Sequence, residues 1–215
     1  MKRLLAIVIC LPVFLGLAHA SPITLFDSID GSTNFALNGI VKTTGTTYTG
    51  LYASFSTLAS AFALQTVELA LADKVAPTTG GFTVNLVADS STTPGGLLDV
   101  IATEPDTFLT TSLTDYTFAT NIALAPNTRY WIEVLANPTN SSVGGWELTQ
   151  TLTGPEVSTE YFGQNSGFVD PNSTAGFAFE MNLDGVNTPE PSTIFLGLIG
   201  LAILAAHRLR VRAVV

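Results

Sequence analysis

The sequence predicts an all-β protein whose folded part is a single antiparallel β-sandwich, jelly-roll-like in size. Short runs in which apolar and polar residues alternate recur along the chain, as they do in strands that face a core on one side only. Turn-forming Gly, Pro and Asn residues separate these runs. Between residues 21 and 191 there is no convincing long helical pattern and no cysteine. Eight to eleven short strands, regular turns and no disulfide are typical of a sandwich.

The expected strands differ in how clearly they alternate. Residues 177–184 alternate apolar with small or polar side chains without a break, and residues 67–72 and 82–86 repeat this pattern. Residues 130–135 are apolar on both faces, which favours a central strand. Residues 58–71 are rich in Ala and Leu, but the alternation at their end favours a strand after a turn over a helix.

Turns are expected where Gly, Pro and Asn cluster, because these residues supply the backbone angles that a turn requires. The clusters are Gly80-Gly81, Pro94-Gly95-Gly96, Pro126-Asn127, Asn137-Pro138, Gly144-Gly145, Gly154-Pro155 and Asp170-Pro171-Asn172.

The first twenty residues have the pattern of a secretory signal peptide. A basic pair precedes an apolar run over residues 4–17, and a small-x-small site ends at Ala20. We expect signal peptidase to cleave between Ala20 and Ser21. A lipoprotein site at Cys10 is a poorer interpretation, since Cys10 lies within the hydrophobic run and follows an isoleucine rather than a small residue.

The chain ends in a short hydrophobic segment followed by arginines. Residues 194–206 are small or apolar, and as a helix they would reach roughly 20 Å, less than the roughly 30 Å of a bilayer core. They are therefore expected to form a minimal transmembrane helix. Arg208, Arg210 and Arg212 follow it and predict a cytoplasmic tail, which leaves the rest of the chain outside.

Pro189-Glu190-Pro191 precedes this helix, and the whole arrangement resembles the PEP-CTERM sorting signal. That family comprises exported proteins of Gram-negative bacteria that also make exopolysaccharide, and an integral-membrane exosortase acts at or near the motif. The resemblance implies that these three residues are recognised by the exosortase and that the helix anchors the precursor or is removed. An ordinary single-pass anchor is the alternative.

The expected organisation is a signal peptide at 1–20, a sandwich ectodomain at 21–184, a linker with the motif at 185–193, the helix at 194–206 and the tail at 207–215. Residues 82–135 resemble the choice-of-anchor domains of exported bacterial proteins, type R in particular. Those modules are β-rich, and the resemblance brings no catalytic residues with it.

Charge excludes one class of partner. Between Ser21 and Pro191 the basic residues are Lys42, Lys74 and Arg129, set against all 17 acidic residues, for a formal net charge of −14. Nucleic acid is not expected to bind, because phosphate contacts need clustered Lys and Arg.

Missing residue types exclude several mechanisms. Cys10, His19 and His207 all lie in the targeting segments, so the ectodomain cannot hold a Ser-His-Asp or Cys-His site or a zinc site with His or Cys ligands. No phosphate-binding glycine loop occurs. We therefore expect no catalytic residues, no cofactor and no metal. Calcium needs only oxygen ligands and so does not depend on His or Cys, but solvated turn carboxylates are the favoured interpretation of two acidic groups, Asp27, Asp30, Ser32 and Asp170, Asn172, Asp184.

Two alternatives to a purely structural ectodomain remain open. Exposed aromatic rings could bind sugars, with Trp146 at an expected loop mouth and Trp131 as the leading candidates, and Tyr48, Tyr52, Tyr130 and Tyr161 as others. A glycoside hydrolase would need two facing carboxylates from Glu68, Glu133, Glu147 and Glu180. All four suit a solvent face except Glu133, whose neighbours are bulky.

The leading expectation is an exported, non-catalytic protein of the cell surface or extracellular matrix. Its expected partners are signal peptidase, an exosortase, the membrane before processing, and an exopolysaccharide of a biofilm.

Overall fold

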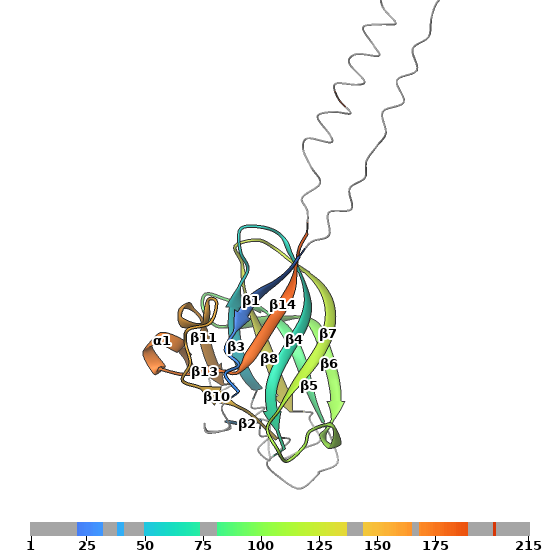
Figure 1. Cartoon of the computed structure of the whole chain (residues 1–215), viewed down its shortest axis with the longest axis vertical. Helices are drawn as coiled ribbons and strands as arrows, with labels where there is room; N and C mark the ends of the chain where they lie inside the picture. Colours follow the sequence, from blue (N-terminus) through green and yellow to red (C-terminus); the bar gives the residue numbers. More distant parts are fainter. Residues whose placement is uncertain are drawn as a thin grey trace, which may run out of the picture.

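The computed structural model describes residues 21–31, 38–40, 50–73, 81–136, 144–164, 168–188 and Gly200. Two antiparallel sheets pack face to face (Figure 1), as the sequence predicts. The strands are β1 (Pro22–Asp27), β2 (Asn38–Ile40), β3 (Gly50–Ser56), β4 (Phe62–Ala72), β5 (Gly81–Asp89), β6 (Pro94–Pro105), β7 (Thr114–Leu124), β8 (Arg129–Ala136), β9 (Gly144–Trp146), β10 (Leu148–Thr149), β11 (Tyr161–Gln164), β12 (Phe168–Pro171), β13 (Ala178–Phe179) and β14 (Met181–Asn187). Short helical turns occupy η1 (Asp106–Phe108), η2 (Val157–Thr159) and α1 (Asn172–Ala175).

The front sheet in Figure 1 contains β1, β14 and β4 side by side, with β7 on the other side of β4. β9 pairs with the far end of β4, and β2 pairs with β9. The back sheet has the order β12-β11-β3-β8-β5-β6. All of these ladders are antiparallel.

The core lies between the two sheets and follows the predicted alternation. β4 contributes Val67, Leu69 and Leu71, and β8 contributes Ile132 and Val134, all of them 0 % exposed. β8 lies between β3 and β5, which confirms the prediction of a central strand. Residues 62–72 form β4, so the choice of strand over helix is also confirmed.

β4 changes its neighbour at Ala70, where three strands meet. Leu69 pairs with Met181 on β14, whereas Leu71 pairs with Trp146 on β9. A ring of three backbone bonds closes the junction: Ala70 donates to the Glu180 carbonyl, Glu180 donates to the Glu147 carbonyl, and Glu147 donates to the Ala70 carbonyl. Beyond it, β10 and β13 continue as a two-stranded ladder. We call this point the three-strand junction.

Two predicted turns are strand residues instead. Gly144 and Gly145 belong to β9. A side chain at Gly144 would place its Cβ 2.7 Å from the Ala72 carbonyl oxygen and 2.8 Å from a Leu109 methyl, so glycine here serves close packing rather than reversal. Pro94-Gly95-Gly96 opens β6, and the reversal before it lies at residues 90–93.

Other predicted turns are confirmed. Asn127 adopts a positive φ of 49° between β7 and β8, an angle that asparagine tolerates. Gly154-Pro155 lies in an irregular segment after β10. Asn137-Pro138 falls outside the described residues.

The last strand continues beyond its predicted end. β14 runs to Asn187 rather than 184, and the Thr188 amide donates to the Ala61 carbonyl at 2.9 Å. The expected linker at 185–193 therefore begins as strand. The signal peptide, the Pro-Glu-Pro motif, the helix 194–206 and the basic tail lie outside the described residues. Within the described ranges, no helix is both long and apolar enough to cross a bilayer.

Candidate functional site

The two ends of the domain lie side by side. Pro22 of β1 pairs with Val186 of β14, and the start of β1 meets the end of β14 at one end of the sandwich (Figure 1). Ser21, the expected first residue of the mature chain, is exposed. The residue that follows signal cleavage and the residues that lead to the sorting motif therefore leave the fold together.

Trp146 does not lie at a loop mouth, as its sequence context suggests. It is 0 % exposed, its ring stacks on Phe179 with centroids 4.6 Å apart, and its indole N–H donates to the Glu180 carbonyl at 2.7 Å. The reason is that Gly144 and Gly145 form a strand rather than a turn and place Trp146 in the core. The prediction of a sugar-stacking face on Trp146 is therefore wrong.

Trp131 is also fully buried, although it points away from the core between the sheets. It lies on the outer face of the back sheet, beside Tyr161, with ring centroids 6.4 Å apart. Its indole N–H donates to Asp89 Oδ1 at 2.8 Å. Trp131 therefore offers no ring face to solvent either, and the prediction of a sugar platform on this residue is wrong as well.

Among the four glutamates considered for hydrolysis, Glu147 and Glu180 come together at the three-strand junction. Their backbones share one of the junction's hydrogen bonds, and the side chains are 2 % and 1 % exposed. Glu68 lies on the outer face of the front sheet, where Asn182 Nδ2 donates to it at 3.5 Å. Glu133 lies in the back sheet.

Glu180 faces other carboxyl groups. Burial, a hydrogen bond shared with Asp30, and the negative charges of Asp30, Glu147 and Asp115 raise the pKa of Glu180 to about 8. Its Oε1 atom is buried without a hydrogen-bond partner. At neutral pH the side chain is therefore mainly the uncharged acid.

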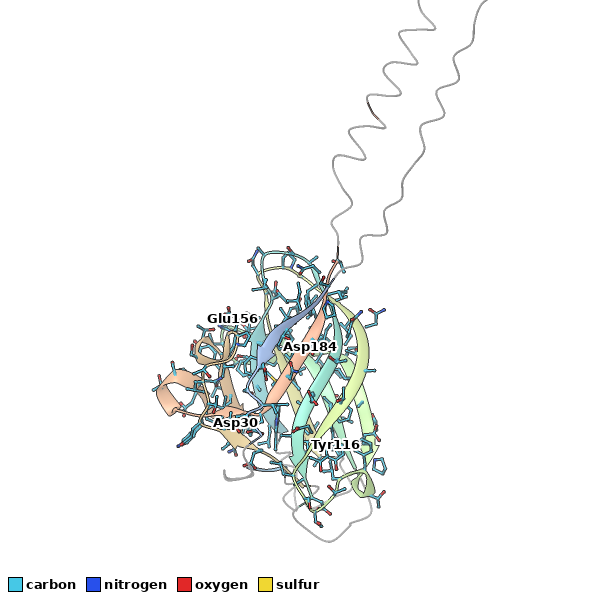
Figure 2. All side chains as sticks on the ribbon, in the orientation of Figure 1. Asp30, Tyr116, Glu156 and Asp184 are labelled. Atoms are coloured by element: carbon cyan, nitrogen blue, oxygen red, sulfur yellow. The ribbon has the colours of Figure 1, made fainter. Side chains whose placement is uncertain are left out.

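Asp30 reaches the junction from the segment that follows β1 and is labelled in Figure 2. Its Oδ2 atom accepts hydrogen bonds from the hydroxyls of Thr149 at 2.6 Å and Thr151 at 2.7 Å. These bonds hold Asp30 in place beside Glu180, whose pKa it helps to raise.

The acidic residues considered for calcium do not converge. Asp27 accepts the Ile29 amide, Asp184 accepts the Thr24 hydroxyl at 2.6 Å, and Asn172 donates to the Val157 carbonyl. Ser32 lies outside the described residues. Within the part of the chain that is described, no group of three or more Asp, Glu, His or Cys side chains could hold a metal.

The outer face of the back sheet carries a second polar cluster, in which Tyr52, Glu133 and Asn85 lie in one cross-strand row. Tyr52 on β3 pairs with Glu133 on β8, which pairs with Asn85 on β5. Asn85 Nδ2 donates to Glu133 Oε2 at 2.8 Å, and the Tyr52 hydroxyl donates to the same carboxyl group. Burial, with Glu133 adding to it, raises the pKa of Tyr52 far above its usual range. We call these three residues the outer row.

The sequence points to this cluster only in part. Tyr52 is one of the candidate aromatics, and Glu133 is the glutamate that does not suit a solvent face, but nothing in the sequence joins them or adds Asn85. Their pairing depends on strand register, which is a property of the folded sheet.

Arg129, the only basic residue among those described, supports the same face. Its Nε donates to Glu160 Oε2 at 2.9 Å, and its guanidinium lies over the Tyr161 ring, 4.8 Å from the centroid. The Ser54 hydroxyl also donates to Glu160. Glu160 is 1 % exposed and the Arg129 side chain is 25 % exposed, so a buried carboxyl group holds a partly exposed arginine over Tyr161.

No curated protein matches the sequence. One solved structure that matches contains the cysteine protease and lectin-like domains of Cwp84, a surface layer associated protein of Clostridium difficile. It is 15 % identical with a TM-score of 0.45, and the alignment covers 66 % of this chain and 32 % of that one.

The C-terminal segment matches a known sorting motif. Residues 187–212 match the PEP-CTERM protein-sorting motif, as the Pro-Glu-Pro sequence predicts. The match starts at Asn187, which is also the last residue of β14. The resemblance of residues 82–135 to choice-of-anchor domains stays a prediction. The motif marks this chain as an exported protein that an exosortase sorts from a membrane-anchored precursor to a cell-surface form.

Proposed function

We propose that the ectodomain is a non-catalytic module of the cell surface or extracellular matrix in a Gram-negative bacterium that makes exopolysaccharide. The sorting match at residues 187–212 carries this proposal, because it directly follows a complete folded domain. In this role the chain is the substrate of the exosortase, and a biofilm matrix is its destination.

The geometry of the last strand supports processing after folding. β14 is paired on both sides, with β1 and with β4, and the Thr188 amide is bonded to Ala61. Cleavage near Pro191 would therefore leave all of the described strands in the sandwich, since the last of them ends at Asn187. The described ladders of β14 with β1 and β4 would be kept in the processed domain.

The placement of the glutamates supports a non-catalytic role. A glycoside hydrolase needs two carboxyl groups that reach the substrate on either side of the scissile bond. Glu147 and Glu180 lie together but are 2 % and 1 % exposed, while Glu68 and Glu133 lie on different sheets. The pair at the junction is better explained as part of the fold.

Mass spectrometry of the mature protein from the producing cell tests the processing route. We expect a first residue at Ser21 and a last residue near Pro191. Glu190→Ala should accumulate as a longer, membrane-bound precursor, and Thr193→Ala, just outside the motif, should be processed like the parent. An intact Val215 in the final product of the parent chain would contradict the proposal.

A further inference from the structure

The outer row differs from the other outward-facing polar residues of the sandwich in its chemistry. It joins an aromatic ring, a carboxylate and a carboxamide across three neighbouring strands. The two donors to Glu133 are neutral groups, the Tyr52 hydroxyl and Asn85 Nδ2. Among the described residues, the groups that hold the Glu133 carboxyl are thus neutral donors, and its oxygens can accept further hydrogen bonds.

Asn85 leaves one acceptor unused. Its Nδ2 is committed to Glu133, whereas Oδ1 is buried without a partner, and the residue is 5 % exposed. An unsatisfied buried acceptor costs about 1–3 kcal/mol relative to a bonded one. Because Oδ1 is closed to solvent, the role of Asn85 in the row is to hold the Glu133 carboxyl group through Nδ2.

Glycines border Tyr52 on two sides. Gly163 on β11 is its cross-strand partner and has no side chain. Gly50 lies two residues away on β3, on the same face, and a Cβ there would come within 3.1 Å of Glu133 Oε1 and 3.3 Å of the Tyr52 ring. Any larger residue at position 50 would crowd both the ring and the carboxylate.

Apolar surface continues the row at its other end. Asn85 pairs with Val100 on β6, which is 47 % exposed, and Leu97 on the same edge strand is 59 % exposed. A ligand along the row would thus meet an aromatic ring, a carboxyl group and an apolar edge. Polyhydroxylated sugars have this mixture of hydroxyl donors and apolar C–H faces, and such faces stack on aromatic rings.

The net charge of the ectodomain favours a neutral sugar over an anionic one. The ectodomain has a formal net charge of −14 between Ser21 and Pro191, and the row itself contains Glu133. Anionic polymers are repelled by such a surface, and the repulsion is largest at low salt. We propose that the outer row of Tyr52, Glu133 and Asn85 binds a neutral glycan, with the Tyr52 ring as the stacking face, Glu133 as the acceptor of its hydroxyl protons and Asn85 as the residue that orients Glu133.

The front sheet supplies a matched control. Glu68 and Asn182 form the same carboxylate–carboxamide pair across two strands, and Asn182 Oδ1 is also buried without a partner. In the ladders on either side, Glu68 pairs with Thr117 and Asn182 pairs with Asp27, so this pair has no cross-strand aromatic neighbour. The proposal therefore predicts that only the pair beside Tyr52 binds sugar.

Affinity electrophoresis of the mature protein tests this prediction, using gels that contain a neutral β-1,4-glucan, dextran or galactomannan, with alginate as the anionic polymer. We expect retardation in at least one neutral gel and none in alginate. Glu133→Gln and Tyr52→Ala should each weaken the retardation about tenfold or more, as expected for a lost charge-assisted bond or stacking face. Glu68→Gln should leave it unchanged.

Folding is checked by near-ultraviolet circular dichroism, and Tyr52→Phe keeps the ring if Tyr52→Ala fails to fold. Tyr52→Phe should retain stacking and lose less affinity than Glu133→Gln. Three results would overturn the proposal. The parent protein could migrate unaltered in every neutral gel, it could be retarded more by alginate than by the neutral polymers, or Glu68→Gln could lose as much retardation as Glu133→Gln. None of these results bears on the processing near Pro191, so the two proposals fail separately.

Discussion

Glu133 and Glu180 each stand between two core residues in the sequence yet have opposite surroundings. Glu133 lies within β8, between Ile132 and Val134, whereas Glu180 lies between the end of β13 and the start of β14. Glu133 is surrounded by donors, the Tyr52 hydroxyl and Asn85 Nδ2. Glu180 is surrounded by acceptors, the carboxyl groups of Asp30, Glu147 and Asp115.

The difference shows that a glutamate between two core residues can have either kind of environment. Donors hold the Glu133 carboxyl group on the back sheet. Burial and neighbouring carboxyl groups favour the protonated acid of Glu180 at the three-strand junction. The first arrangement is suited to a ligand, whereas the second ties the fold to pH.

The largest expected effect on stability comes from Trp146, which packs at the three-strand junction. Trp146→Ala removes a fully buried indole, its stacking on Phe179 and its bond to the Glu180 carbonyl. We expect the free energy of unfolding to fall by about 3–5 kcal/mol, as for other large-to-small core changes. Denaturant titration measures it, and Leu58→Ala, at a 45 % exposed position, should change the value by less than about 1 kcal/mol.

The next effect concerns the proton on Glu180. An unfolded glutamic acid titrates near pH 4.5 and the folded one near 8, so between these values the folded state binds more protons than the unfolded state. Stability must then fall as pH rises through this window and level off above it. The total loss is on the order of a few kcal/mol, because one pKa unit corresponds to about 1.4 kcal/mol.

The Glu180→Gln variant isolates the contribution of this proton to the pH dependence of stability. The variant should be more stable than the parent at pH 8 to 9 and should lose the slope between pH 5 and 8, as measured by denaturant titration at several pH values. A parent protein whose stability is flat across this range, or a variant with the same slope, would show that Glu180 is charged at neutral pH.

The Asn85→Asp variant would give the back sheet two adjacent carboxyl groups, as at the three-strand junction. It places a second carboxylate beside Glu133, at a contact that is now 2.8 Å. We expect a loss of about 1–3 kcal/mol at pH 7 that is recovered as pH falls toward 4, because two adjacent carboxylates cannot both ionise without cost. Asn182→Asp beside Glu68, at a 3.5 Å contact, is the matched change and should cost less. Equal losses of stability in the two variants would mean that the Asn85–Glu133 contact is no closer in solution than the Asn182–Glu68 contact.

The smallest effect is expected from Tyr52→Phe, which removes one donor from Glu133 and keeps the ring. The expected loss is about 1 kcal/mol, the typical value for one hydrogen bond. Absorbance titration of the parent gives an independent measure, since the raised pKa of Tyr52 predicts that this phenol ionises only when the domain unfolds in alkali. Ionisation of every tyrosine near pH 10 in the folded protein would contradict the raised pKa of Tyr52.

Local patterns predict much of this fold. The alternation at Val67, Leu69 and Leu71 and the doubly apolar run at 130–135 give β4 and the central β8 correctly, since side-chain direction along a strand follows from sequence alone. The sorting signal is likewise a local pattern, and its match at 187–212 confirms it.

The errors come from contacts between distant segments. Gly144-Gly145 has the composition of a turn, and only the closeness of Ala72 shows why glycine is needed in a strand. Glu180 alternates like a solvent-facing residue, but Asp30 covers it from a segment 150 residues earlier in the chain. No local pattern reports which segment covers a face, so neither the buried Trp146 nor the outer row could be predicted.

The pairing of β1 with β14 places the two ends of the domain close enough for the domain to be inserted into another protein. Because the chain enters and leaves through neighbouring strands, Pro22 beside Val186, both ends could be joined to two adjacent points of another protein without threading through the sandwich. The same ectodomain could then be carried in a surface loop of an unrelated scaffold or on a different kind of tail. Its fold depends on the partnership of its first and last strands, and not on what holds it to the cell.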